Sequence, residues 1–424
     1  MQPTPVVLSF IRHDGEVLLS APIDSSEEVP VPYLKGCSAE SATSAIESET
    51  EIQSCQVMLV REGSIIENRK GIGHMQRTST AERTHEHHHA ERPSQIYPLL
   101  FNYLDDRPPQ SEWVPPTALR QREQGLLWRA YTRVRPTISS IKRDTESGSA
   151  TLSIRALEVL RDEAALLVRD ESEFDTIEEV ARKLATVRPS MTAVSNRIGR
   201  VVADLDSLKP EQTITRATKA ITRALTADAE AALRAGDRIE NQRVATLSRS
   251  ETVLRALTDG DPNAVLVAES RPGGEGVSAA KQIQPNRLVV VTSDAAFPGQ
   301  LSDWGAETVL VGADSILSDG AVVNKVGTFP AALSATRHNI SLIVVAASDK
   351  ISPSTAFDPD PRDGAEIGCE SSTLEVRNPT FERTPPSYVD TFVTERGILG
   401  TSEIQAIANE HANYHSFLSS DETT

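Results

Sequence analysis

Three stretches between Val265 and Thr328 decide the fold: VLVAESRPGGEG from Val265, LVVVTSDAAFPG from Leu288 and TVLVGADSILSDGAVVNKVGT from Thr308. Each apolar run is short, rich in Val and Leu, and bounded by Gly, Pro or Asp. Such runs are typical of strands buried on both faces of a parallel sheet. The segment therefore predicts an α/β domain with a doubly wound, mostly parallel, Rossmann-like sheet.

Polar residues and glycines follow these apolar runs. In parallel sheets, ligands bind beyond the carboxyl ends of the strands, where backbone amides and helix N-termini point outward. The sequence therefore predicts a small anionic ligand, a phosphate ester, at this edge. The residues predicted to line its site are Arg271, Gly273, Gly274, Gly276, Asp294, Asp314, Asn324 and Lys325.

Several of these residues have a structural alternative. Arg271 has a planar guanidinium group suited to binding phosphate, but it could instead form an ordinary ion pair. Asp294 could cap a helix, and Asn324 with Lys325 could form a tight turn with a surface charge. Asp314 is the strongest candidate for the cleft.

Six short blocks resemble one protein family. They are Ser270-Arg271-Pro272 with Gly276, Gly312-Ala313-Asp314, Asn324-Lys325-Val326-Gly327-Thr328, ARKLATVRPSMTAVSNRI from Ala181, TLSRSETVLRAL from Thr246 and NPTFERTPPSYVDTFVTERGIL from Asn378. Taken in their order along the chain, they resemble the translation initiation factor 2B alpha/beta/delta family. That family includes ribose-1,5-bisphosphate isomerase and methylthioribose-1-phosphate isomerase. The resemblance covers roughly Ile141 to Phe417.

The resemblance implies a site with one family residue kept and one replaced. The family's isomerases place a cysteine and an aspartate beside the sugar phosphate, where they divide the acid and base roles. Asp314 matches the aspartate, but Ser248 stands at the cysteine position. Because a serine hydroxyl is negligibly ionised near neutral pH, the chain resembles the family's non-catalytic regulatory subunits more than its isomerases.

The main expectation is therefore a regulatory protein that binds a sugar phosphate or nucleotide in the Asp314 cleft. The resemblance adds Arg188 to this cleft. It also implies a homodimer or larger assembly, and a partner in the translation initiation machinery. The first alternative is a ribose-1,5-bisphosphate isomerase-like enzyme that uses Asp314 with Ser248.

The first 118 residues resemble a degenerate Nudix domain. VVLSFI and EVLLSA predict two strands joined by a turn at His13-Asp14-Gly15, and GCSAESATSAIESETEI corresponds to the Nudix helix. Of that helix's core metal-binding glutamates only Glu49 matches, so no metal site and no cofactor are expected. A Nudix hydrolase of a nucleoside diphosphate derivative, which would require Mg²⁺, is the second alternative.

A histidine cluster, HEHHHA with His85, His87, His88 and His89, lies in a polar stretch predicted to be a loop. Imidazole is the commonest transition-metal ligand. However, ordering a loop around a metal costs conformational entropy, and adjacent residues rarely form a closed site. The sequence predicts no specific metal site there.

The remaining boundaries follow from composition. Residues 119–140 are predicted to be a joint, 141–240 a helical subdomain and 241–424 the Rossmann-like domain. DTIEEVARKLATV has Thr176 and Glu179 at capping-box spacing, and Gly236 follows a long Ala-rich helical pattern.

Composition excludes several classes of protein. The 424 residues carry a net charge of −17, which is dispersed and opposes non-specific binding of nucleic acid. Three cysteines without short spacing predict neither a disulfide framework nor a zinc knuckle. Nothing approaches eighteen consecutive apolar residues, so a cytoplasmic protein without membrane contact is expected.

Overall fold

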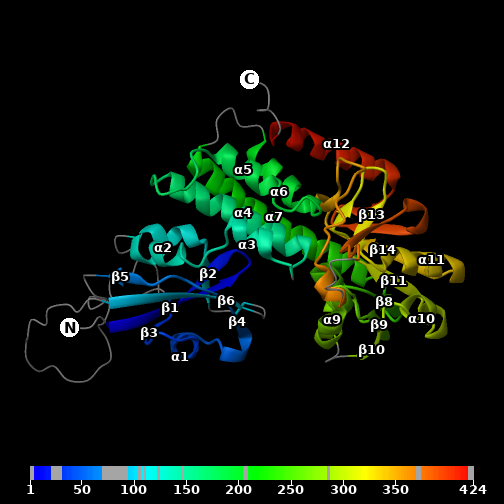
Figure 1. Cartoon of the computed structure of the whole chain (residues 1–424), viewed down its shortest axis with the longest axis horizontal. Helices are drawn as coiled ribbons and strands as arrows, with labels where there is room; N and C mark the ends of the chain where they lie inside the picture. Colours follow the sequence, from blue (N-terminus) through cyan, green and yellow to red (C-terminus); the bar gives the residue numbers. More distant parts are fainter. Residues whose placement is uncertain are drawn as a thin grey trace, which may run out of the picture. The chain divides into compact units, whose positions relative to one another are not determined.

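The computed structural model describes residues 4–20, 31–68, 94–103, 107–108, 111–121, 125–145, 147–203, 209–283, 287–368 and 374–418. The chain forms two compact units, Met1–Pro136 and Thr137–Thr424 (Figure 1). The histidine cluster at 85–89 and Cys369 lie outside the described residues. Among the described residues, no helix is both long and apolar enough to cross a bilayer.

The first unit contains one mixed sheet with helices. Its strands are β1 (Thr4–His13), β2 (Glu16–Leu19), β3 (Tyr33–Lys35), β4 (Val57–Glu62), β5 (Ile66–Asn68), β6 (Ser94–Tyr103) and β7 (Glu112–Val114). Its helices are α1 (Ala39–Glu49), η1 (Ser54–Gln56), η3 (Pro116–Gln121) and α2 (Leu126–Tyr131). The strand order is β4-β6-β1-β2-β7, with β3 also paired to β1 and β5 to β6.

The predicted opening hairpin of this unit is confirmed. β1 and β2 are antiparallel with His13 opposite Glu16. Asp14 and Gly15 both have positive φ, 51° and 76°, as a two-residue hairpin turn requires. The Nudix interpretation remains a prediction. In the described part of the chain, no group of three or more His, Cys, Asp or Glu side chains could hold a metal ion.

The second unit begins with helices. They are α3 (Ile138–Arg143), α4 (Ser149–Leu167), α5 (Ile177–Ala185), α6 (Thr192–Val202) and α7 (Pro210–Gly236). The predicted start of α5 is confirmed, because the Thr176 side chain accepts a hydrogen bond from the Glu179 amide at 3.1 Å. Gly236, predicted as the C-cap of the Ala-rich helix, is instead the last residue of α7, and Asp237 is the C-cap.

A seven-stranded sheet follows in the second unit. Its strands are β8 (Arg243–Thr246), β9 (Ala264–Ala268), β10 (Leu288–Thr292), β11 (Thr308–Val311), β14 (Ser341–Val345), β16 (Thr391–Thr394) and β17 (Gly397–Leu399). The helices among and after them are α8 (Glu251–Asp259), α9 (Glu275–Ile283), α10 (Phe297–Asp303), α11 (Thr328–His338), η6 (Ser348–Lys350), η7 (Gly364–Ile367), η8 (Pro386–Tyr388) and α12 (Thr401–Leu418).

The order of these strands is β10-β9-β8-β11-β14-β16-β17. All neighbouring pairs are parallel except β16 with β17. The first six strands thus have the 3-2-1-4-5-6 order of a doubly wound sheet, and the order reverses between β8 and β11. The predicted parallel sheet is therefore present, and its reversal point marks where a ligand is expected.

Two details of the predicted strands were wrong. β10 is not buried on both faces, because it is the edge strand of the sheet and Leu288 is 62% exposed. The run from Thr308 also does not form strands of one sheet. After β11, the chain enters a small antiparallel sheet of β12 (Ser315–Ile316), β13 (Val322–Lys325) and β15 (Phe381–Thr384). Asn324 and Lys325 therefore lie at the end of β13 and not of a parallel strand.

Candidate functional site

A cavity of about 460 Å³ lies at the carboxyl ends of β8, β9, β11 and β14. Its lining includes Ser248, Glu275, Asp314 and Lys350, which follow these four strands in that order. β8 lies between β9 and β11, so the segments that follow these three strands are neighbours. The cavity thus lies at the point where the strand order reverses.

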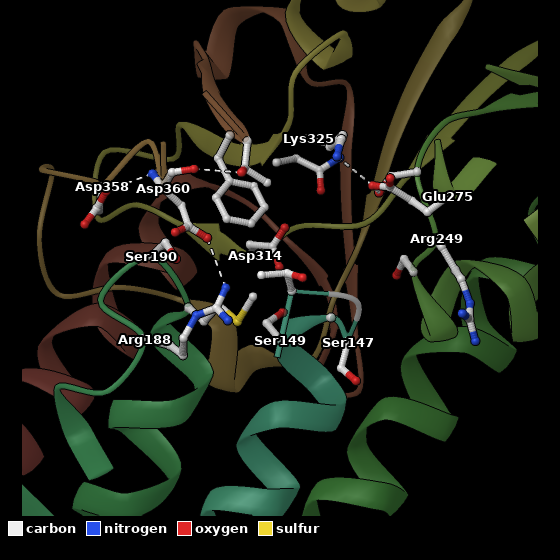
Figure 2. Close-up of a pocket in the computed structure, with 18 of the residues that line it drawn as sticks. Ser147, Ser149, Arg188, Ser190, Arg249, Glu275, Asp314, Lys325, Asp358 and Asp360 are labelled. Atoms are coloured by element: carbon white, nitrogen blue, oxygen red, sulfur yellow. Dashed lines mark hydrogen bonds and ion pairs between the residues drawn. The ribbon is translucent and has the colours of Figure 1, made fainter. Parts of the chain in front are cut away.

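Asp314 lies in the middle of the close-up view of this cavity (Figure 2). Its amide donates to the Val323 carbonyl at 2.9 Å, which fixes the residue after β11. Burial raises the pKa of the Asp314 carboxyl above its ordinary value, although Lys350, hydrogen bonding with Ser149, and Arg188 act in the opposite direction. A carboxyl with a raised pKa is suited to give and take protons near neutral pH.

Lys350 is a buried lysine that lines the same cavity as Asp314, and it was not among the predicted site residues. Its Nζ donates to the Ala313 carbonyl at 2.7 Å, and its side chain is almost wholly buried. Burial lowers the pKa of Lys350, while the charge of Asp314 raises it. The rule that identified Asp314 would have found Lys350, had it been applied to the next buried run, SLIVV at 341–345.

Ser248, the residue at the family's cysteine position, lines the cavity after β8. It has a φ of 67°. Its amide donates to Ser270 Oγ at 2.7 Å, and its hydroxyl donates to Glu275 Oε1 at 3.1 Å. Glu275 Oε1 also lies 2.8 Å from Lys325 Nζ. A dashed line marks this ion pair in Figure 2. Ser248, Glu275 and Lys325 thus form a continuous polar chain along one wall.

Arg188 lies at the opposite side of the cavity from Lys325 in Figure 2. Its guanidinium donates to the Asp144 carbonyl and, at 3.0 Å, to Asp360 Oδ2. Asn324 also lines the cavity, with its amide group donating to Thr328 Oγ1 at 3.0 Å. The structure thus brings Arg188, Asn324, Lys325, Ser248 and Asp314 to one cavity.

The other predicted ligand residues do not line this cavity. The Arg271 side chain is 65% exposed and contacts Glu269 at 3.4 Å. Asp294 accepts hydrogen bonds from the Ser270 and Arg271 amides at 2.7 and 2.6 Å. Gly273 and Gly274 form the turn after these amides, with φ of 99° and 73°. Together these residues shape the 270–275 turn that carries Glu275, and their direct contact with a ligand remains a prediction.

Gly276 has a packing role that makes a testable prediction. A Cβ at this position would lie 1.9 Å from the Ala268 carbonyl oxygen and 2.8 Å from Ser270 Oγ. Gly276→Ala should therefore displace α9 from β9 and destabilise the protein by roughly 1–3 kcal/mol, as overpacking does. Thermal unfolding of this variant beside Gly299→Ala, where a Cβ meets nothing within 4 Å, measures the effect. Equal melting temperatures for the two variants would contradict it.

Charges of both signs surround the cavity. Its basic side chains are Lys142, Arg188, Arg249, Lys325, Lys350 and Arg362. Several are paired with acidic side chains of the same lining: Arg188 with Asp360, Lys325 with Glu275, Arg249 with Glu251 and Arg362 with Glu366. An anionic ligand would compete with these carboxylates for the basic groups.

A buried ionic cluster lies next to Lys350 in the chain. Arg197 of α6 is 1% exposed, and its Nε donates to Asp349 Oδ2 at 2.9 Å. Arg200 contacts Asp349 Oδ1 at 2.6 Å, and Asp228 of α7 contacts Arg197 at 3.2 Å. Burial would raise the pKa of Asp349, but the charges of Arg197 and Arg200 outweigh it and hold the pKa far below its ordinary value. The cluster fixes the turn that carries Lys350.

Known proteins resemble more than half of this chain. The chain is 30% identical to the Haloferax volcanii protein named ribose 1,5-bisphosphate isomerase over an alignment of 307 residues, which covers 66% of this chain and 93% of that protein. The structure of the Pyrococcus horikoshii OT3 translation initiation factor eIF-2B matches with a TM-score of 0.54 and 26% identity, covering 62% of this chain and 94% of that one.

A second solved structure shares the fold. It belongs to the tetrameric eIF2B-beta2-delta2 complex from C. thermophilum and matches with a TM-score of 0.51 and 17% identity, over 70% of this chain and 98% of that one. The model of the initiation factor 2 subunit family matches residues 145–401, more than half of the chain. With the parallel sheet and the Asp314 cavity in place, the chain belongs to the initiation factor 2 subunit family.

Proposed function

We propose that this protein is an aldose–ketose isomerase of a phosphorylated pentose, similar in activity to ribose 1,5-bisphosphate isomerase. The observation that carries the proposal is Asp314, a half-buried carboxyl with a raised pKa that shares one cavity with basic side chains and a second carboxylate, Glu275. The Haloferax volcanii relative supports the same class of substrate.

The chemistry of such a substrate defines what the cavity must do. In a ribose 1-phosphate, the anomeric carbon carries a phosphate ester and the ring oxygen, so it has no free carbonyl group. Isomerisation must protonate the ring oxygen, break its bond to carbon 1 and remove the proton from carbon 2. Asp314 is the acid in this proposal, because its raised pKa keeps a proton available to the ring oxygen. The reaction is an internal rearrangement, so its balance needs no redox cofactor.

The basic side chains would hold the phosphate groups. The planar guanidinium of Arg188 can donate two hydrogen bonds to one phosphate. Lys325 and Lys350 are largely buried, and each would contribute a single positive charge. In this structure the Arg188 guanidinium donates to Asp360 Oδ2 at 3.0 Å. A ligand phosphate would therefore exchange with the Asp360 carboxylate.

Turnover of ribose 1,5-bisphosphate tests the proposal. Purified protein is incubated with this sugar and followed by phosphorus NMR, with thermal unfolding measured in parallel. We expect a ketose bisphosphate to appear and the melting temperature to rise. Absence of product over hours at micromolar protein would overturn the isomerase proposal.

A ligand-sensing regulatory protein is the second candidate, and Ser248 favours it. A serine hydroxyl is a poor base, and here it already donates to Glu275. In this case the same experiment gives thermal stabilisation without product. A partner in translation initiation and an assembly of several copies belong to this candidate, by analogy with the eIF-2B structures. Size-exclusion chromatography with light scattering, with and without the sugar, measures the assembly.

A further inference from the structure

The isomerase chemistry leaves one group without an assignment. A base must take the proton from carbon 2, and Ser248 cannot serve, because its hydroxyl remains protonated near neutral pH. The base must also lie beside Asp314 along the cavity wall. Only a carboxylate or a neutral amine of the lining can meet both requirements.

Most acidic side chains of the lining are held in other interactions. Asp360 pairs with Arg188 at 3.0 Å, and Glu366 pairs with Arg362 at 2.9 Å. Asp358 and Asp363 accept from the backbone of their own segment, at the Asp360 and Ala365 amides. These four acids belong to one segment, 358–366, and their interactions are mainly within it. Glu251 is 49% exposed beside Arg249.

Glu275 differs from these acids in its position. It begins α9 after β9, while Ser248 follows β8 and Asp314 follows β11. Because β8 lies between β9 and β11, the three residues come from three adjacent strand ends. Neighbouring strands are about 4.8 Å apart, so groups at such ends can reach one small substrate from two sides.

The carboxylate of Glu275 is also held in place. Its Oε1 accepts from Ser248 Oγ at 3.1 Å and pairs with Lys325 Nζ at 2.8 Å. Ser248 itself is fixed by the bond from its amide to Ser270 Oγ, and Lys325 by its bond to the Pro272 carbonyl. A base positioned by a donor and a cation is the arrangement expected for stereospecific proton removal.

We infer that Glu275 is the base that carries the proton from carbon 2 to carbon 1, with Ser248 and Lys325 as positioning residues. This inference rests on the proposed isomerase function. The carboxylate takes the carbon 2 proton, and the freed electron pair forms the carbon 1–carbon 2 double bond. The bond from carbon 1 to the ring oxygen breaks, and Asp314 protonates that oxygen.

The second half of the reaction returns both protons. The enol hydroxyl at carbon 2 gives its proton to the Asp314 carboxylate, which forms the ketone. Carbon 1 then receives the proton from Glu275. Both side chains end in their starting states, and the product is an isomer of the substrate.

Glu275→Gln tests the inference, because glutamine keeps the size and one acceptor oxygen but loses the basicity. We expect turnover of ribose 1,5-bisphosphate to fall on the order of 100-fold, with KM within about threefold of its original value. Exchange of deuterium from D₂O into carbon 1 of ribulose 1,5-bisphosphate should fall in parallel. Glu269→Gln in the same loop, outside the cavity lining, is the matched control and should leave turnover within about twofold.

Ser248→Cys in the Glu275→Gln background gives a rescue experiment. A thiolate restores a base on the same wall, so turnover should rise at least about tenfold over Glu275→Gln alone. Such a gain would not follow if glutamine had only distorted the fold.

Each outcome has a defined meaning. If the unaltered protein forms no ketose, the isomerase function fails and this inference fails with it. If the unaltered protein is active and Glu275→Gln retains full turnover and exchange, only the assignment of Glu275 is overturned. A loss of ribose 1,5-bisphosphate binding, seen as lost thermal stabilisation in Glu275→Gln, would make Glu275 a binding group and also overturn its role as the base.

Discussion

Replacing Asp314 with asparagine should lower turnover of ribose 1,5-bisphosphate on the order of 1,000-fold, within the range that general acid catalysis contributes. Asparagine has the same shape, and its amide oxygen can still accept a hydrogen bond. It cannot give a proton to the ring oxygen or take one back from the enol hydroxyl. The loss should therefore fall on kcat, while the sugar continues to raise the melting temperature.

The matched control is Asp319→Asn. Asp319 lies outside the cavity lining and pairs with Arg383 on the surface at 2.5 Å. Its side chain is 36% exposed, so its loss should leave turnover within about twofold and stability within about 1 kcal/mol. If Asp314→Asn retained more than a tenth of the turnover, Asp314 would not be the acid.

The pH dependence of kcat/KM gives an independent check on Asp314. Burial raises the pKa of this carboxyl, so the protonated form persists to higher pH than in an exposed aspartate. The acid form is lost as pH rises through the raised pKa, and turnover should fall there. Asp314→Asn should remove this decline from its residual activity. A decline of the same shape in the variant would assign it to another group.

The sequence predicted those parts of the site that follow one local rule. Polar residues after buried parallel strands meet at one edge of a sheet, which placed Asp314 in the cavity. The resemblance placed Ser248 and Arg188 there. The same rule placed Asn324 and Lys325 wrongly. The apolar run from Thr308 continues past β11 into strands of a second, antiparallel sheet, and nothing in the run marks this change. They reach the cavity from β13 instead.

What the sequence could not predict depends on contacts between distant residues. The pairing of Arg188 with Asp360 joins residues 172 positions apart, and the bond from Arg197 to Asp349 joins residues 152 apart. Nothing local to either residue specifies its partner. Glu275 was also missed, because the sequence RPGGEG is consistent with an ordinary acidic residue in the first turn of a helix. Its contacts with Ser248 and Lys325, which are distant in the sequence, distinguish it.

Replacing Asp349 with asparagine should produce the largest loss of stability, about 3 kcal/mol, at the lower end of the range for breaking a buried ion pair. Arg197 is 1% exposed and would keep a single charged partner, Asp228 at 3.2 Å. The midpoint of urea unfolding, followed by circular dichroism, should fall by roughly 1 M if the slope is about 3 kcal/mol per M. Asp259→Asn, which removes an exposed salt bridge with Arg255 on α8, should change the midpoint of urea unfolding little.

The pH dependence of this loss separates charge from packing. The pKa of Asp349 is held far below its ordinary value of about 3.9, so the ion pair stabilises the fold fully above that pH. As pH falls below about 3.9, Asp349 becomes protonated in the unfolded chain but stays ionised in the folded protein, so the stabilisation declines. The difference in the free energy of unfolding between the unaltered protein and Asp349→Asn should therefore be largest at pH 7 and clearly smaller at pH 3. A pH-independent difference would mean that asparagine disturbs the packing of η6 and not its charge. It would remove the electrostatic reason for the placement of Lys350 in the lining of the Asp314 cavity.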